Sequence, residues 1–134
     1  MAVKEKVFSN GLVVKHRRSA IIFENANGKN EKQVDFKYAF TDEELQEFVD
    51  YLTEIANEAW NNVKPKEATT IGADYWEYYD RKCDNNGYLR IQKSGIWIEA
   101  PHLSKDTLYQ FNKAKIESFI YDLQEKVNNH AEVY

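Results

Sequence analysis

The sequence has little cysteine, proline or glycine, and it has no long apolar run. Cys83 is the only cysteine, which excludes an internal disulfide and the disulfide framework of small secreted domains. This cysteine and the widely separated His16, His102 and His130 do not have the spacing of zinc ligands. No apolar run approaches the ~18–20 residues that span a bilayer. We therefore expect no metal site, no cofactor and no membrane segment.

The length and composition are those of one globular domain. The chain has 134 residues, of which 43% are apolar and 30% charged, enough to bury one core. We treat residues 1–134 as a single domain with a first half (1–63), a short polar link (64–69) and a second half (70–134). The first ten residues contain no apolar signal-peptide core, so a cytoplasmic location is expected.

Charge is distributed unevenly along the chain. Residues 1–40 contain eight Lys/Arg and four Asp/Glu, a net charge of +4. Residues 41–62 contain seven acids and no base, a net charge of −7, and the remainder carries −1. This polarisation is the most informative property of the sequence.

In the first half, strand patterns precede one helix pattern. Asn10-Gly11 is typical of a hairpin turn and lies between apolar runs at 3–8 and 12–16. Further strands are predicted at 20–24 and 33–40, the latter with strict alternation of buried and exposed positions. Thr41 and Glu44 form a capping-box pattern, after which apolar residues recur at helical spacing to about Asn62.

The second half repeats this plan. Strands are predicted at 74–81, 88–93 and 96–100, with Asp84–Gly87 and Ser94-Gly95 as turns. A helix is predicted from Ser104 to about Asn129. The fold class is therefore α+β, with two antiparallel β-meander segments each followed by an amphipathic helix. Both helices would cover one continuous sheet or two abutting sheets.

The first helix carries a row of acids opposite its apolar residues. At ~100° per residue its members share one side of the helix, over a length of about 22 Å. Like charges at this spacing repel, and no base is interleaved. The row can imitate a phosphate backbone and bind a basic partner, or it is a solvated face that maintains solubility. Its members are Glu43, Glu47, Asp50, Glu54 and Glu58.

The first hairpin is basic. With a two-residue turn at Asn10-Gly11, Phe8 would pair with Val13, Lys6 with Lys15, and Lys4 with Arg17. Adjacent like-charged pairs are unfavourable without a counter-anion. The hairpin either contacts phosphate or an acidic protein, or is an edge that its lysines protect from aggregation.

The second half contains an aromatic sheet face. With Ser94-Gly95 as the turn, Ile91 would face Ile98, and Arg90 would lie across from Glu99. One alternative is a stacking platform for single-stranded nucleic acid, and the other is an aromatic face covered by the rest of the fold. The residues of the nucleic-acid alternative are Lys4, Lys6, Lys15, Arg17, Tyr88, Arg90 and Trp97.

No motif indicates catalysis or identifies a family. The sequence assigns no histidine to Cys83 as a base. Asn112 is expected near the apolar side of the second helix, either as a capped or hydrogen-bonded core residue or as a site residue. The strand–helix order resembles that of Whirly-like single-strand binders, without their lysine-rich motifs. The composition resembles small accessory proteins of phages and mobile elements.

These observations favour a non-enzymatic binding protein whose acidic helix engages a basic macromolecule. An inhibitor of a nucleic-acid-handling enzyme, of the anti-defence or anti-CRISPR type, fits this description. A single-stranded nucleic-acid-binding module is the alternative. The oppositely charged segments would also permit self-association into a homo-oligomer.

Overall fold

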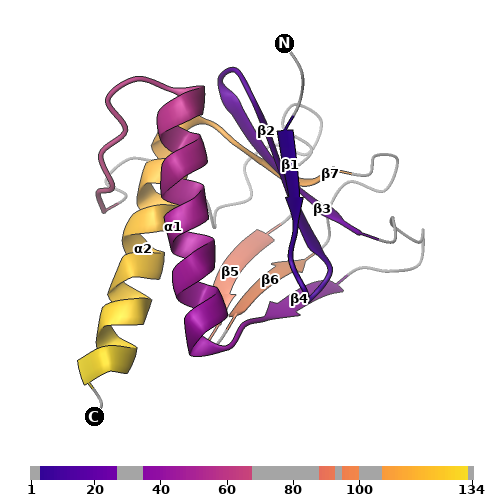
Figure 1. Ribbon diagram of the computed structural model, residues 1–134, viewed down its shortest axis with the longest axis vertical. Helices are drawn as coiled ribbons and strands as arrows, with labels where there is room; N and C mark the ends of the chain where they lie inside the picture. Colours follow the sequence, from indigo (N-terminus) through magenta and orange to yellow (C-terminus); the bar gives the residue numbers. More distant parts are fainter. Residues whose placement is uncertain (1–3, 27–34, 68–87, 93–94, 100–106, 133–134) are drawn as a thin grey trace.

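The computed structural model describes residues 4–26, 35–67, 88–92, 95–99 and 107–132 (Figure 1), and for Lys4, Tyr88 and residues 128–132 the backbone alone. Within these ranges it contains seven strands and two helices in the predicted order of strands, helix, strands and helix. The α+β fold class is therefore confirmed. The predicted strand at 74–81, the turn at 84–87, Cys83, Trp76 and His102 lie outside the described residues.

The strands form two antiparallel sheets. The first has the order β1 (Lys4–Val7), β2 (Leu12–Arg17), β3 (Ala20–Asn25) and β7 (Thr107–Phe111). The second has the order β4 (Asp35–Ala39), β6 (Gly95–Glu99) and β5 (Tyr88–Gln92). Each sheet thus takes one strand from the other half of the sequence, because β7 pairs with β3 and β4 pairs with β6.

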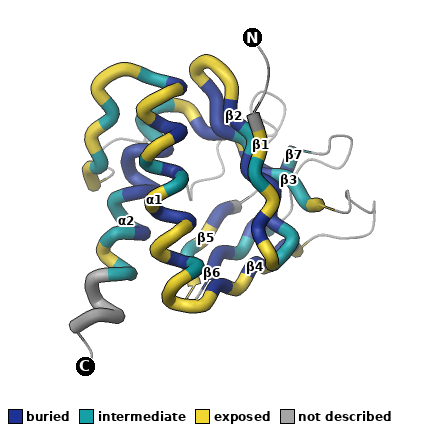
Figure 2. Tube along the Cα trace, in the orientation of Figure 1, coloured by how far each residue is buried: buried dark blue, intermediate teal, exposed yellow. Residues whose placement is uncertain are grey.

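The two helices, α1 (Asp42–Ala59) and α2 (Lys113–Glu132), lie side by side in opposite directions against the sheets (Figure 1). Buried and exposed positions alternate along α1, with the buried ones turned to the core (Figure 2). One apolar cluster joins both sheets and both helices. Its largest fully buried side chains include Phe23, Phe36, Phe48, Tyr109, Phe111 and Phe119.

The predicted register of the first hairpin is wrong by one residue. Phe8 and Leu12 flank a three-residue loop, closed by hydrogen bonds from Phe8 N–H to Leu12 O and from Gly11 N–H to Phe8 O, both 2.9 Å. Gly11 has a φ of 93°, the conformation that follows a type I turn in such loops. The extra loop residue places Glu5 opposite Lys15.

The like-charged cross-strand pairs therefore do not form. Lys6 lies opposite Val14, and Lys4 lies opposite His16 instead of Arg17. Lys15 Nζ lies 2.9 Å from Glu24 and 3.9 Å from Glu5. The counter-anions of Lys15 therefore come from the neighbouring strands β3 and β1.

The capping box at the start of α1 is confirmed. Glu44 N–H donates to Thr41 Oγ1 at 3.1 Å, and Thr41 N–H donates to Glu44 Oε1 at 3.0 Å. The Ser9 hydroxyl also donates to Glu44. Hydrogen bonds from Ser9 and Thr41 lower the pKa of Glu44, because they stabilise its carboxylate. They also tie the hairpin loop to the first turn of α1.

The predicted start of the second helix at Ser104 is wrong, because residues 107–111 form β7 and α2 begins at Lys113. Thr107, Leu108, Tyr109 and Phe111 are β-branched, apolar or aromatic, and β7 fills the edge of the first sheet beside β3. Asn112 is exposed and caps α2, since Lys115 N–H donates to Asn112 Oδ1 at 2.8 Å. It is therefore a capping residue outside the core.

The β5–β6 register differs from the prediction by two residues. Ile91 pairs with Ile96, Leu89 with Ile98, and Arg90 with Trp97 instead of Glu99. A shift of two keeps every side chain on its predicted face, because the side-chain period of a strand is two. Leu89, Ile96 and Ile98 are accordingly buried in the core.

Candidate functional site: the acidic face of α1

The acidic row of α1 is exposed along its whole length. Glu43, Glu47, Asp50, Glu54 and Glu58, hereafter the acidic face, are all solvent-exposed. The apolar side of α1 sets this orientation, since it is buried against the core at Leu45, Phe48, Val49, Leu52, Ile55, Ala56 and Ala59. No lysine or arginine occurs between residues 41 and 62. The carboxylates therefore form one anionic strip about 22 Å long.

The negative potential of this strip acts on a neighbouring side chain. Burial of the Tyr51 phenol raises its pKa, and the charges of Glu54 and Glu58 raise it further. A nearby carboxylate opposes ionisation of a phenol, because ionisation would place two negative charges side by side. The part of this pKa shift that comes from Glu54 and Glu58 reflects the negative charge at this end of the acidic face.

The basic hairpin lies beside the acidic face and neutralises part of it. Lys6 Nζ lies 2.8 Å from Glu47 Oε1, and also lies over the rings of Phe8 and Tyr51. His16 Nε2 lies 3.8 Å from Glu58 Oε2. Some of the opposite charges that would permit self-association are therefore paired with each other within one chain.

The turn between β2 and β3 holds the C-terminal end of α1. Ser19 N–H donates to Ala59 O at 3.1 Å, and Ser19 has a φ of 61°. This contact satisfies one of the carbonyl groups left open at a helix end. It fixes the acidic face relative to the first sheet.

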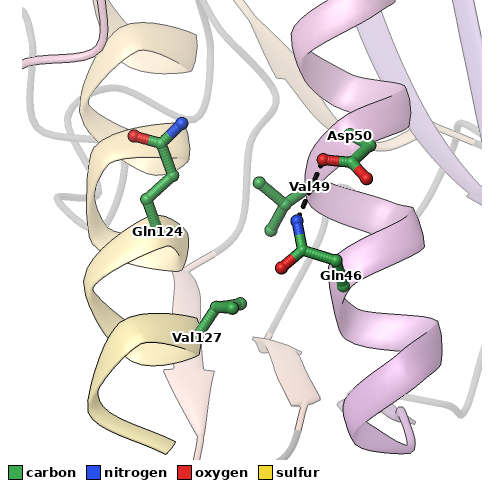
Figure 3. Close-up of a pocket in the computed structure, with 5 residues that line it drawn as sticks. All are labelled: Gln46, Val49, Asp50, Gln124 and Val127. Atoms are coloured by element: carbon green, nitrogen blue, oxygen red, sulfur yellow. Dashed lines mark hydrogen bonds between the residues drawn. The ribbon is translucent and has the colours of Figure 1, made fainter. Parts of the chain in front are cut away.

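A groove separates α1 from α2 next to the acidic face. It has a volume of about 320 Å³. Figure 3 shows its lining residues projecting from the two helices, with Gln46 Nε2 donating to Asp50 Oδ1 at 2.9 Å. Asp50 therefore belongs both to the acidic face and to the groove wall. The described lining consists of Gln46, Val49, Asp50, Gln124 and Val127.

The outer face of the second sheet carries Trp97 between two cations. Lys37 Nζ lies 4.7 Å from the Trp97 ring centroid, and the Arg90 guanidinium carbon lies 5.6 Å from it. The half-buried Trp97 donates its indole N–H to Asp35 Oδ1 at 3.1 Å. Its ring is thus approached from both neighbouring strands, which limits the room for a stacked base. Lys37 was not among the predicted residues, since its pairing with β6 crosses the two halves.

The residues of the nucleic-acid alternative are not gathered at one place in the fold. Lys6 and Lys15 contact carboxylates on the first sheet and α1, and Arg17 is exposed at the end of β2. Arg90 and Trp97 lie on the other sheet. The backbones of Lys4 and Tyr88 are placed on β1 and β5, and their side chains are outside the described part of the structure.

The burial of the polar side chains of Glu117 and His16 was not predicted. Glu117 Oε2 accepts the Lys64 N–H at 2.9 Å, and Glu117 Oε1 lies 3.8 Å from Lys66 Nζ. Through these contacts the Glu117 carboxylate links residues 64–66, which follow α1, to α2. His16 is also buried, and its Nδ1 has no hydrogen-bond partner among the described residues. No sequence pattern distinguishes either residue from an exposed one.

Within the described ranges, no group of three or more His, Cys, Asp or Glu is placed to hold a metal ion. No helix in the same ranges is long and apolar enough to cross a membrane. Comparison of the chain with protein-family models, curated proteins and solved structures gives no match.

Proposed function

We propose that this chain is a non-enzymatic binding protein that engages a basic macromolecular partner through the acidic face of α1. The supporting observation is the exposure of all five carboxylates along one helix that contains no base. The ion pair of Lys6 with Glu47 illustrates the contact that the face makes with a cation. Such a strip complements a basic surface and accelerates encounter with it.

The class of partner that fits is a nucleic-acid-handling enzyme. Its binding groove is basic because it neutralises phosphates. A rigid row of carboxylates about 22 Å long would occupy such a groove as a nucleic-acid mimic and inhibit the enzyme. An anti-defence or anti-CRISPR inhibitor from a phage or mobile element would act in this way.

Reversing three charges of the acidic face is expected to weaken binding at least tenfold. The variant is Glu47→Lys, Asp50→Lys and Glu54→Lys, and the probe is a fluorescent nona-lysine peptide followed by anisotropy at low salt. Each exposed pair contributes ~0.2–1 kcal/mol, and reversal replaces attraction by repulsion of similar size. Circular dichroism and thermal unfolding verify that the variant remains folded.

A matched control separates the acidic face from net charge. Glu67→Lys, Glu125→Lys, Gln92→Lys and Gln110→Lys together change the net charge by the same amount at exposed positions outside α1 and the first hairpin. We expect this scattered variant to retain most of the affinity. Equal losses in the two variants would show that only net charge matters, and the proposal would be abandoned.

A single-stranded nucleic-acid-binding module remains the second candidate, because Lys37 and Arg90 place two cations that could contact phosphates beside the Trp97 ring. The same anisotropy assay with a mixed-sequence single-stranded oligonucleotide tests it. Under our proposal the oligonucleotide does not bind at micromolar protein. Saturable binding with quenched tryptophan emission and a steep salt dependence would favour the second candidate instead.

A further inference from the structure

The groove between α1 and α2 differs chemically from the rest of the acidic face. Its described walls combine one carboxylate, two primary amides and two valine side chains. The two valines form the apolar part of the wall: Val49 is buried, and Val127 is half-buried against the core cluster. Elsewhere the carboxylates of the acidic face are exposed, and Glu47 and Glu58 contact side chains of the first hairpin. The groove therefore offers both a charged group and apolar contact within a space of about 320 Å³.

We propose that this groove receives one arginine side chain of the basic partner, an inference that rests on the proposed function. The guanidinium group has five N–H donors and no acceptor, so it needs several oxygens at one place. Asp50 provides a carboxylate, and the amide groups of Gln46 and Gln124 face the groove from opposite helices (Figure 3). Val49 and Val127 contact the methylene stem.

The carboxylate of Asp50 retains capacity for this contact. A carboxylate has about four lone-pair sites, and the bond from Gln46 Nε2 uses one of them. That bond also holds the carboxylate in one orientation on the groove wall. The Gln124 amide presents its carbonyl oxygen to the groove after a half-turn about its last side-chain bond. Asp50 Oδ2 and the carbonyl oxygens of Gln46 and Gln124 are then three acceptors, from two helices, that can surround one guanidinium.

The size and chemistry of the groove select arginine over other occupants. A volume of about 320 Å³ is at the lower limit of small-molecule sites, which are typically ~300–1,000 Å³. A lysine ammonium is compact and strongly hydrated. It therefore gains no more from the groove than from the exposed carboxylates outside it. The guanidinium is planar and more weakly hydrated, so it loses less on entering a partly apolar groove.

The test compares nona-arginine and nona-lysine peptides in the anisotropy assay at equal salt. We expect the wild-type chain to bind nona-arginine about fivefold more tightly than nona-lysine. Asp50→Asn is expected to abolish this preference. Glu54→Gln makes the same charge change outside the groove, and is expected to weaken both peptides equally while the preference stays.

A second variant fills the groove without changing charge. Val127→Phe places an aromatic ring in the space between the helices, and is expected to reduce nona-arginine binding to the level of nona-lysine. Equal binding of the two peptides by the wild-type chain, or equal effects of Asp50→Asn and Glu54→Gln on the preference, would overturn the arginine groove and leave the proposed function standing. Failure of the wild-type chain to bind either peptide would overturn both.

Discussion

Replacing Phe48 by alanine is expected to lower the free energy of unfolding by about 3–5 kcal/mol, the cost of truncating a buried phenylalanine. Phe48 is fully buried in the middle of α1. Its ring stacks on Phe40 with centroids 4.7 Å apart, and it meets Phe8 edge-on at 5.4 Å. Removing the ring leaves a cavity and also loses these aromatic contacts.

Phe48 matters more than other apolar residues of α1 because it joins several elements. Its ring centroid lies 5.9 Å from that of Phe23 on β3 and 6.4 Å from that of Phe119 on α2. The surrounding rings come from the first hairpin, from β3, from Phe40 between β4 and α1, and from α2, so they are held by separate elements and cannot all move into the space that the ring leaves. The loss is therefore expected near the upper end of the range for such substitutions.

Urea denaturation followed by circular dichroism measures this loss. Phe48→Leu keeps part of the volume and is expected to lose less than Phe48→Ala. Val7→Ala is the surface control, since Val7 is 57% exposed, and its effect is expected within about 0.5 kcal/mol. A Phe48→Ala variant as stable as Val7→Ala would contradict the aromatic core described here.

Replacing Gly95 by alanine is expected to cost about 3 kcal/mol or more, a large value for overpacking. A Cβ atom at Gly95 would lie 2.1 Å from Tyr38 O and 3.0 Å from Ala39 Cα. Both atoms belong to the backbone of β4, the strand in which Ala39 pairs with Gly95 of β6. The strands can relieve the contact only by separating, and β6 is the central strand of its sheet.

Gly11 provides the matched comparison for this prediction. Among the described residues, the nearest atom to a Cβ there is Asn25 Oδ1 at 3.9 Å, but the φ of 93° is unfavourable for alanine. Gly11→Ala is therefore expected to cost only about 1 kcal/mol, from backbone strain alone. Thermal and urea unfolding of both variants measure the difference. Equal losses at the two positions would show that Gly95 does not approach β4 as closely as described.

The sequence alone was sufficient where the determinants are local. The capping box of Thr41 and Glu44 and the apolar spacing behind it predicted α1, and the structure has this helix from Asp42 to Ala59. The same periodicity also placed all five members of the acidic face at exposed positions. Helical periodicity relates neighbours three or four residues apart, so no tertiary information is needed to assign the two sides.

Local patterns were insufficient where one residue of loop length changes the result. Asn10-Gly11 was correctly placed in a turn, but the loop contains three residues instead of two. The strand register therefore shifts by one residue, and Glu5 lies opposite Lys15 in place of the predicted Lys6. At 107–111 the apolar residues suit either a helix or a strand. Pairing with β3 decides in favour of the strand, and such a partner lies far away in the sequence.

What the sequence determined by itself is the α+β class, the order of its elements and the exposed acids of α1. Tertiary structure decided which strands pair between the halves, which cations reach the acidic face, and which residues line the groove. Lys6 contacts Glu47 across 41 residues, and Gln124 faces Gln46 only because α2 packs on α1. Contacts of this kind depend on the packing of the whole core, since folding brings together residues that lie far apart in the sequence.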